Sequence, residues 1–565
     1  MSDKKQEIQD NIPWQIYPRP QMKRDSFLCL NGEWDFTISK DADRPLAFDR
    51  KILVPFAPES EASGLSLHHE VGEWLHYRLR FSLPDGFVSG GEVLLHFGAV
   101  DQIARVTLNG RLLSEHEGGY LPFSLSVKET LEEQNELWVA VRDDLDHSYP
   151  WGKQKRDRGG MWYTPVSGIW QTVWMEALPE GAIRSLRIEQ TLENATLTFE
   201  SDAPVLRVVL EDGTVVPVTD NRVTIVPKQI HPWSPEHPYL YTFRAETESD
   251  TVESYFALRE IAIGTVGEHP RILLNGEPYF FHAMLDQGYY RDGIYLPSTP
   301  ERMEADILFA KQMGFNTLRK HIKIEPMVFY HWCDLHGVVV FQDFVNNGDY
   351  SFLRDTALPT VGLKRLCDRL LHRDPVTRER FLKAADETVA HLYNCPSVLY
   401  YTVFNEGWGQ FDADSAYERY RAADPSRIFD ATSGWFKRSK SDVRSEHVYF
   451  KKLKQGRSDG RPFVVSEFGG YSLRIADHTF RKENYGYKLF QTEKELTDAL
   501  VALYENEVIP LVGKGLCASV LTQLSDVEDE TNGLITYDRE YIKVDEGRMR
   551  NVSDALTRAI KKTAQ

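Results

Sequence analysis

The stretch that decides the fold is residues 398–407, VLYYTVFNEG, an apolar run that ends on Asn405 and Glu406. A second run at residues 463–470, FVVSEFGG, carries Glu467 directly after its apolar residues. Unbroken apolar runs of this length are typical of strands that are buried on both faces of a parallel sheet. A carboxylate after such a strand is costly to bury unless it is paired or used, so both glutamates call for an explanation.

The sequence on either side of these two runs alternates between strand-like and helix-like patterns. Amphipathic helices are predicted at 299–313 and 375–393, and a third begins with the capping-box pair Thr492 and Glu495. Further apolar runs of strand length lie at 279–284, 316–320, 338–343, 428–432, 447–450 and 519–523. Eight β/α units within about 300 residues predict a TIM (β/α)8 barrel over residues 263–565, with an active site at the carboxyl ends of its strands.

The first half of the chain has a different texture. Residues 1–178 read as many short strands separated by turns such as Asn109-Gly110, which predicts a jelly-roll β-sandwich. Residues 179–262 contain about seven short strands and predict an immunoglobulin-like β-sandwich. The chain is therefore expected to be a multidomain protein with its chemistry in the barrel.

Composition excludes several classes of function. The net charge of −18 argues against a nucleic-acid partner, and no apolar stretch is long enough to span a membrane. The polar N-terminus lacks the apolar core of a secretory signal, so a cytoplasmic location is expected. Five scattered cysteines form no disulfide framework and no zinc motif. Aromatic residues reach 12%, which fits sugar stacking and a β-rich core equally well.

The two glutamates end the fourth and the seventh predicted strand, so they are expected to face each other across the barrel mouth. Hydrolysis of a glycosidic bond needs such a pair of carboxyl groups, which lie about 5–5.5 Å apart in retaining enzymes. The alternative is structural: each glutamate pairs with a nearby arginine or caps a helix. Two acids on these two strands favour the catalytic interpretation.

The residues around both acids resemble a known family. Asn405-Glu406-Gly407 and residues 466–470 (SEFGG) resemble the acid/base and nucleophile motifs of glycoside hydrolase family 2, which includes β-galactosidases, β-glucuronidases and β-mannosidases. The resemblance covers nearly the whole chain, in the domain order of the family's three-domain members. Four N-terminal segments resemble the family's sugar-binding jelly roll: 30–36 (LNGEWDF), 97–101 (FGAVD), 106–110 (VTLNG) and 166–171 (VSGIWQ).

The resemblance implies a retaining exo-β-glycosidase. It makes Glu406 the general acid/base, Glu467 the nucleophile that forms a covalent glycosyl-enzyme, and Asn405 a donor to the substrate's 2-hydroxyl. The family often has Arg and His at the places of Arg319 and His321, where a cation would keep Glu467 ionised; the alternative is a structural salt bridge. The other predicted binding residues, with core packing or pairing to Arg319 as the alternatives, are Asp286, Asp343, Trp408, Trp435, His447, Tyr449 and Gln523.

Two departures from the family bear on the substrate. Many members place a tryptophan near the end of the eighth strand, where this chain has Val520 and Leu521. Family β-glucuronidases carry an Asn-x-Lys pair after that strand, but residues 529–536 read DETNGLIT, which lacks the lysine and is acidic. We therefore expect a neutral sugar on a small oligosaccharide or glycoside, with galactose first and mannose or glucose as alternatives. β-Glucuronidase specificity and a catalytically silent carbohydrate-binding protein also remain alternatives.

The sequence shows no motif for a cofactor. It has no metal-ligand spacing, so no cofactor is expected, and a divalent cation in the acidic loop 526–530 is less favoured than a solvated loop. A metal-dependent hydrolase would need ligands at strand ends, for which only His282, His321 and His447 are candidates. The family's members often form homo-oligomers. Whether the jelly roll adds a loop to the active site is left open, with residues 156–160 and Trp162 as its candidates.

Overall fold

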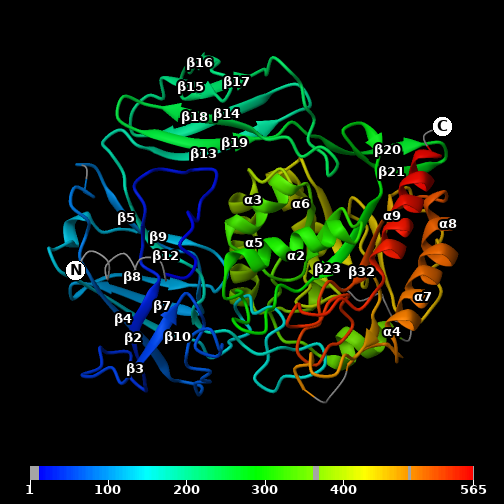
Figure 1. Cartoon of the computed structure of the whole chain (residues 1–565), viewed down its shortest axis with the longest axis horizontal. Helices are drawn as coiled ribbons and strands as arrows, with labels where there is room; N and C mark the ends of the chain where they lie inside the picture. Colours follow the sequence, from blue (N-terminus) through cyan, green and yellow to red (C-terminus); the bar gives the residue numbers. More distant parts are fainter. Residues whose placement is uncertain (1–11, 89, 361–367, 482–484, 564–565) are drawn as a thin grey trace.

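The computed structural model describes residues 12–88, 90–360, 368–481 and 485–563. Figure 1 shows three domains: an N-terminal sandwich in blue and cyan, a smaller sandwich above it in teal and green, and a barrel that runs from green to red. Both sandwiches and the barrel are of the predicted kinds.

Antiparallel strands form the N-terminal domain. One sheet has the order β3-β2-β4-β10-β7-β8, a second has the order β1-β12-β5-β9, and β6 pairs with β11. Trp34, Phe36 and Tyr77 are fully buried between the sheets, and Asn109 and Gly110 turn the β7–β8 hairpin with positive φ, as their sequence predicts. The strands are β1 (Leu28–Cys29), β2 (Gly32–Ser39), β3 (Arg50–Val54), β4 (Trp74–Phe81), β5 (Val93–Phe97), β6 (Val100–Asp101), β7 (Ile103–Leu108), β8 (Arg111–Glu117), β9 (Phe123–Ser126), β10 (Asn135–Arg142), β11 (Gly168–Ile169) and β12 (Val173–Ala177).

The second domain packs a three-stranded sheet, β13-β14-β17, against a four-stranded sheet, β16-β15-β18-β19. Its strands alternate as expected for sheets with one solvated face: Tyr241, Phe243 and Ala245 of β18 are buried, and Thr242 and Arg244 between them are exposed. The strands are β13 (Ile183–Gln190), β14 (Ala195–Ser201), β15 (Arg207–Leu210), β16 (Val215–Pro217), β17 (Arg222–Ile225), β18 (Tyr241–Glu246) and β19 (Thr251–Phe256).

Eight parallel strands form the barrel in the order β27-β26-β25-β24-β23-β32-β29-β28, so the sheet is nearly closed between β27 and β28. Every residue of β26 and β29 is buried, which explains the unbroken apolar runs that predict them. The strands are β23 (Phe281–Asp286), β24 (Thr317–Lys320), β25 (Val339–Asp343), β26 (Val398–Asn405), β27 (Ile428–Ser433), β28 (Arg444–Val448), β29 (Phe463–Gly469) and β32 (Leu516–Thr522).

The helices surround the barrel and include the three that the sequence predicts. Thr492 caps α7 by accepting the Glu495 amide at 3.2 Å, and the Glu495 carboxylate accepts the amide of Gln491. The capping box is therefore present, with its returning bond shifted by one residue. The longer helices are α2 (Pro300–Gln312), α3 (Met327–His336), α5 (Pro375–Leu392), α6 (Ala413–Ala423), α7 (Glu493–Leu503) and α9 (Glu546–Lys561). The shorter helical segments are η1 (Lys128–Thr130), η2 (Leu353–Ala357), α4 (Leu358–Thr360), η3 (Asp368–Leu370), η4 (Tyr504–Val508) and α8 (Ile509–Val512).

A small sheet that the sequence did not predict covers the end of the barrel at which its strands begin. It consists of β20 (Ile261–Val266), β21 (His269–Leu274) and β22 (Glu277–Pro278), so the predicted domain boundary at 262/263 falls within β20. Side chains of β20 and β21 pack against the first residues of the barrel strands. A further strand pair, β30 (Tyr471–Leu473) with β31 (Lys488–Phe490), follows β29.

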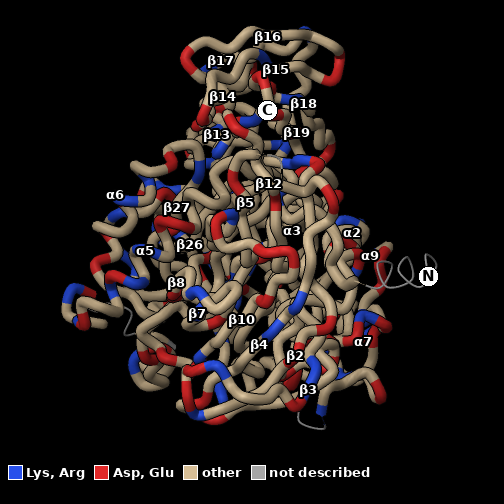
Figure 2. Tube along the Cα trace, turned by 90° about the vertical axis from the view of Figure 1, so that its left-hand side faces the viewer, with Lys and Arg blue, Asp and Glu red and all other residues tan. Residues whose placement is uncertain are grey.

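Two further features of the described residues concern membrane-spanning helices and the pairing of cysteines. Helices long and apolar enough to cross a membrane are absent from them. Cys29, Cys333, Cys395 and Cys517 are buried and unpaired, and the fifth cysteine, Cys367, lies outside the described residues. Basic residues lie among acidic ones along the trace in Figure 2.

Candidate active site

Glu406 leaves the end of β26 through a sharp turn. Its φ is +52°, and Gly407 follows at +77°, so two consecutive residues adopt the left-handed region. A Cβ on Gly407 would lie 2.1 Å from the ring of Phe436, which makes glycine necessary at this position. The Glu406 amide donates to the carbonyl of Ser433 at 2.9 Å and fixes the turn against β27. The turn aims the carboxylate into the barrel mouth.

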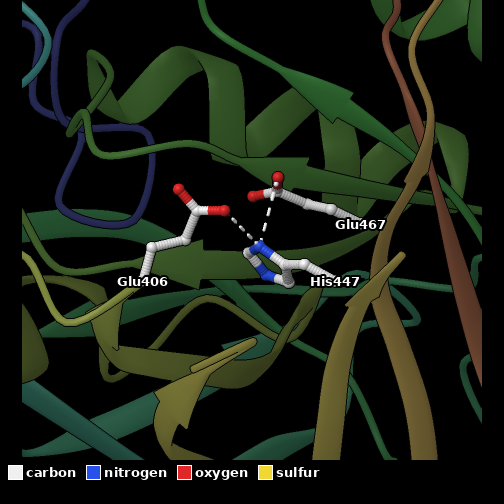
Figure 3. Close-up of side chains that lie close together, drawn as sticks. All are labelled: Glu406, His447 and Glu467. Carbon is white, nitrogen blue, oxygen red and sulfur yellow. Dashed lines mark hydrogen bonds and ion pairs between the residues drawn. The ribbon is translucent and has the colours of Figure 1, made fainter. Parts of the chain in front are cut away.

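Glu406 and Glu467 meet on the imidazole of His447 (Figure 3). His447 Nδ1 lies 2.8 Å from Glu406 Oε1 and 3.4 Å from Glu467 Oε2. One oxygen of each carboxylate and this nitrogen all lie within 4.8 Å of one another. The other ring nitrogen is 3.0 Å from the Ser433 hydroxyl, which also donates to Ser466 Oγ at 2.9 Å. The structure thus brings together the two acids and one of the predicted binding residues.

Arg319 at the end of β24 holds three of the predicted side chains together. Its guanidinium donates to Glu467 Oε1 at 2.9 Å, to Asp343 Oδ1 at 3.0 Å and to Asn405 Oδ1 at 2.8 Å. Arg319 is 1% exposed, so these bonds are made away from bulk water. Because the Asn405 oxygen accepts from Arg319, the Asn405 amide NH2 is the group left to donate to a ligand.

Glu467 is ionised in this setting. Burial opposes its charge, but the positive fields of His447 and Arg319 outweigh burial and lower its pKa to about 2. The hydroxyl of Tyr449 donates to Glu467 Oε2 at 2.5 Å and lies 2.9 Å from the Thr522 hydroxyl. Glu467 is therefore a carboxylate at neutral pH, with both of its oxygens in contact with donors.

His321, Asp343 and Asp286 each pair with another side chain of the protein. His321 Nδ1 lies 2.7 Å from Asp343 Oδ2, and burial, aided by the charge of Lys153, lowers the pKa of His321 well below its usual range. Asp343 pairs with Arg319, whereas Asp286 pairs with Lys320 at 2.7 Å. The sequence left open whether these aspartates bind sugar or pair with Arg319, and the structure gives only Asp343 that pairing.

The predicted aromatic residues differ in exposure. Trp408 is 2% exposed and its ring stacks on Trp162 of the sandwich, with centroids 5.3 Å apart at 28°. Trp435 is half-buried, with its ring centroid 6.5 Å from that of His447, so it borders the carboxylate pair. Gln523 is fully buried, and its amide donates to Asn532 at 2.6 Å. Trp435 is exposed enough to contact a ligand, whereas Trp408 and Gln523 are buried in the protein.

The sandwich contributes a loop to the barrel mouth. Trp151 donates from its backbone and its ring to the carbonyls of Asn346 and Gly348, at 3.0 and 3.1 Å. Farther along, Arg158 pairs with Glu528 at 2.9 Å, and Tyr163 donates to Glu530. Figure 1 shows this cyan segment reaching from the sandwich to the barrel. We call residues 148–164 the docking loop.

Sequence reasoning missed several residues of the site. Ser433, Ser466 and Thr522 hold His447 and Tyr449, but single hydroxyls at strand ends give no distinctive pattern. Lys153 in the docking loop was also missed, although residues 156–160 and Trp162 just beyond it were identified. Nothing in its local sequence marks Lys153 as buried.

The acidic loop after β32 does not form a free cation cage. Asp526 pairs with Lys543 at 2.6 Å, Glu528 pairs with Arg158, and Glu530 accepts from Tyr163. The side-chain clusters with metal-ligand spacing in the described part of the chain are Glu406–His447–Glu467 and His478–Asp538–Glu540. The first consists of the carboxylate pair and its imidazole, and the second is partly exposed.

Comparisons with known proteins agree with this architecture. The β-galactosidase of Thermoanaerobacter pseudethanolicus is 26% identical over 294 residues, which are 47% of this chain and 39% of that protein. The β-glucuronidase of Streptococcus agalactiae is 24% identical over 432 residues, covering 69% of this chain and 68% of that one. A β-glucuronidase structure from an uncultured Clostridium sp. superposes with a TM-score of 0.73 at 17% identity, over 96% of this chain and 100% of that one, which shows the fold alone.

Family models match all three domains in order. Residues 46–166 match the galactose-binding domain-like model of glycosyl hydrolase 2, residues 180–259 match the model named glycosyl hydrolases family 2, and residues 271–474 match that family's TIM barrel domain. Together they cover most of the chain, in the order that the structure shows. The chain belongs to family 2 of the glycosyl hydrolases.

Proposed function

We propose that the protein is a retaining exo-β-glycosidase that works by double displacement. The observation that carries this proposal is the spacing of Glu406 and Glu467, whose nearest oxygens lie within 4.8 Å. Retaining enzymes hold their carboxyl groups about 5–5.5 Å apart, whereas inverting enzymes leave about 6.5–9.5 Å for a water molecule. With one oxygen of each carboxylate within 4.8 Å of the other, the spacing favours the retaining range over the inverting one.

In the first step the ionised Glu467 attacks the anomeric carbon of the substrate. Glu406 gives its proton to the glycosidic oxygen, the bond to the leaving group breaks, and a glycosyl ester forms on Glu467. The Asn405 amide, oriented by Arg319, donates to the sugar's 2-hydroxyl. These contacts stabilise the transition state for glycosyl transfer to the protein.

In the second step Glu406, now a carboxylate, takes a proton from water. The water oxygen attacks the anomeric carbon, the ester bond to Glu467 breaks, and the sugar leaves with its original β configuration. His447 Nδ1 contacts both carboxylates, so its hydrogen bonds change as the proton moves. Each acid thus returns to its starting state.

The identity of the sugar that is cleaved (the glycone) is a separate prediction. The sequence favours galactose, and relatives carry the names β-galactosidase and β-glucuronidase. One reason against a uronic acid was the acidity of the loop after β32, but Glu528 and Glu530 of that loop are bound by Arg158 and Tyr163. Galactoside hydrolysis stays a prediction from sequence, with β-mannosidase and β-glucuronidase specificity as alternatives.

The test of the reaction is a panel of 4-nitrophenyl β-glycosides assayed with wild type, Glu467→Gln and Glu406→Gln. We expect cleavage of at least one glycoside, retention of configuration by NMR, and loss of nearly all activity in the Glu467 variant. A 2-fluoro glycoside of the cleaved sugar should label the peptide that contains Glu467. A silent carbohydrate-binding protein would cleave none of the panel and would take no label.

A cytoplasmic location and assembly into a homo-oligomer belong to the same proposal. The location is proposed from the sequence. The assembly is proposed because members of the family often form homo-oligomers. Size-exclusion chromatography with light scattering tests the assembly directly.

A further inference from the structure

Lys153 stands apart from the other buried lysines of the described residues. The others are Lys320, Lys323 and Lys543. Lys320 and Lys323 pair with Asp286 or Glu325, and Lys543 pairs with Asp526 at 2.6 Å. The ammonium of Lys153 makes no hydrogen bond and no ion pair with any residue in the described ranges, although the side chain is only 8% exposed.

The docking loop fixes the position of Lys153. Its carbonyl accepts the amide of Tyr163 at 2.9 Å, and Trp151 two residues earlier is bonded to the barrel loop after β25. Gly152 has a φ of +68°, and a Cβ there would lie 2.7 Å from the Tyr120 hydroxyl and 3.3 Å from the Ile322 carbonyl. The backbone on both sides of Lys153 is therefore held against the barrel.

The ammonium of Lys153 lies near two aromatic rings and near the predicted nucleophile. It lies 5.6 Å from the ring centroid of Trp408 and 5.8 Å from that of Tyr163. Its charge also lowers the pKa of Glu467 and of His321, which places it within electrostatic range of the nucleophile. Ring faces attract a cation weakly and leave its hydrogen-bond donors unused. An ammonium on a residue this buried, whose donors meet no acceptor among the described residues, is suited to bind an anion.

We propose that Lys153 binds the carboxylate of an acidic sugar whose anomeric carbon is seated on Glu467, so that the substrates are β-uronides. The inference rests on the proposed function and departs from the neutral glycone that the sequence favours. The barrel lacks a lysine at the place after the eighth strand where family β-glucuronidases carry one. In the structure a lysine of the N-terminal domain, Lys153, lies near Trp408 of the barrel, which the sequence does not predict because Lys153 is far from the barrel along the chain.

The experiment compares wild type, Lys153→Met and Lys155→Met. Methionine is one atom shorter than lysine, keeps an unbranched side chain and removes the charge. Lys155 is the matched control because it belongs to the same loop and its ammonium also lies near a ring, 5.6 Å from Trp162, but its side chain is exposed. The readout is the ratio of kcat/KM on 4-nitrophenyl β-D-glucuronide or β-D-galacturonide to kcat/KM on the matching glucoside or galactoside.

We expect wild type to favour a uronide and Lys153→Met to lower the ratio about 100-fold, as expected when one partner of a buried charge pair is removed. Lys155→Met should leave the ratio within about twofold of wild type, because an exposed charge is screened. A wild type that prefers the neutral glycoside would overturn the proposal. So would an equal loss on both substrates in Lys153→Met, since Lys153 would then act through Glu467 alone. If Lys153→Met does not fold by circular dichroism, Lys153→Gln takes its place.

A binding measurement separates this inference from the proposed reaction. Free glucuronate and galacturonate are titrated into wild type and Lys153→Met by calorimetry, with glucose and galactose as neutral controls. If wild type cleaves nothing but binds a uronate that Lys153→Met does not bind, the reaction fails and the inference about Lys153 stands. If wild type cleaves neutral glycosides and binds neither uronate, the reaction stands and the inference fails.

Discussion

Arg319 and Glu467 form a buried ion pair, with Nη1 and Oε1 2.9 Å apart and the arginine 1% exposed. The same guanidinium bonds Asp343 and Asn405, so one cation sets the position of the predicted nucleophile and of the predicted donor to the 2-hydroxyl. Its planar fork suits this task, because a lysine would offer only a point charge.

Replacing Arg319 by methionine should destabilise the protein by about 3–5 kcal/mol, because Glu467 and Asp343 would be left buried without their cation. The pKa of Glu467 should rise, and the acid limb of kcat/KM should move to higher pH. Urea unfolding and a pH–rate profile measure the two effects. Arg319→Lys is the control: it should keep part of the stability but lose the planar fork that bonds Glu467, Asp343 and Asn405 together. An unchanged acid limb in Arg319→Met would show that other charges hold Glu467 ionised.

The pH dependence of stability should carry the signature of Glu467. Its folded pKa of about 2 lies below the ordinary value of 4.5, so its contribution is fully present above about pH 4.5 and is lost as the pH falls toward 2. A shift of this size corresponds to about 3 kcal/mol. Urea unfolding between pH 2 and pH 5 should therefore show a flatter pH dependence in Glu467→Gln than in wild type. Parallel curves for the two proteins would contradict the assignment.

The role of Glu406 should depend on the leaving group. Glu406→Ala should slow hydrolysis of poor leaving groups by about 10²- to 10⁴-fold, because proton donation is lost, and should slow activated aryl glycosides less in the first step. Added azide should rescue the second step, since an anionic nucleophile needs no general base. Steady-state rates across a series of substituted phenols measure this. A loss that is independent of leaving-group pKa would assign the proton to another residue.

His447 should couple the two carboxylates. Its Nδ1 contacts both, so His447→Gln should displace the pH–rate profile by about one unit, equivalent to a tenfold change in the active fraction at a fixed pH on one limb. The bell-shaped profile of kcat/KM is the readout. Ser433→Ala, which removes only the hydroxyl behind the ring, should move the profile less. A uniform drop in rate without displacement would point to packing alone.

Trp162 should anchor the docking loop. It stacks on Trp408 and on Trp151, and Trp162→Ala should cost about 3 kcal/mol of stability as buried aromatic contacts are lost. KM should rise as well, because the loop would no longer be fixed over the mouth. Trp162→Phe keeps a ring and should lose less on both measures. Urea unfolding and steady-state kinetics distinguish this from a purely local effect, in which KM stays constant.

The strands and the two acids could be predicted because the signals are local. Buried parallel strands leave unbroken apolar runs, and Glu406 and Glu467 stand at their ends. The capping of α7 was visible for the same reason, since Thr492 and Glu495 are three residues apart. The three-domain order followed from strand spacing and from motifs spread along the chain.

The partnerships in the mouth could not be predicted, because they join residues far apart in sequence. Arg319 meets Glu467 across 148 positions, and Arg158 meets Glu528 across 370. Asp286 and Asp343 look alike as strand-end acids, yet only Asp343 pairs with Arg319. The predicted boundary at 262/263 falls inside β20, because the β20–β21 hairpin is buried against barrel strands that come later in the chain and leave no local signal.

The docking loop has a consequence for how such proteins could be recombined. The barrel holds both carboxylates, but the docking loop that bonds to the barrel's loops comes from the N-terminal domain. If Lys153 selects the sugar as proposed, a chimaera with the barrel of this chain and the sandwich of a relative would keep both carboxylates and take its choice of sugar from the relative's docking loop. Exchanging the N-terminal domain, which holds neither carboxylate, would then change which sugar is cleaved.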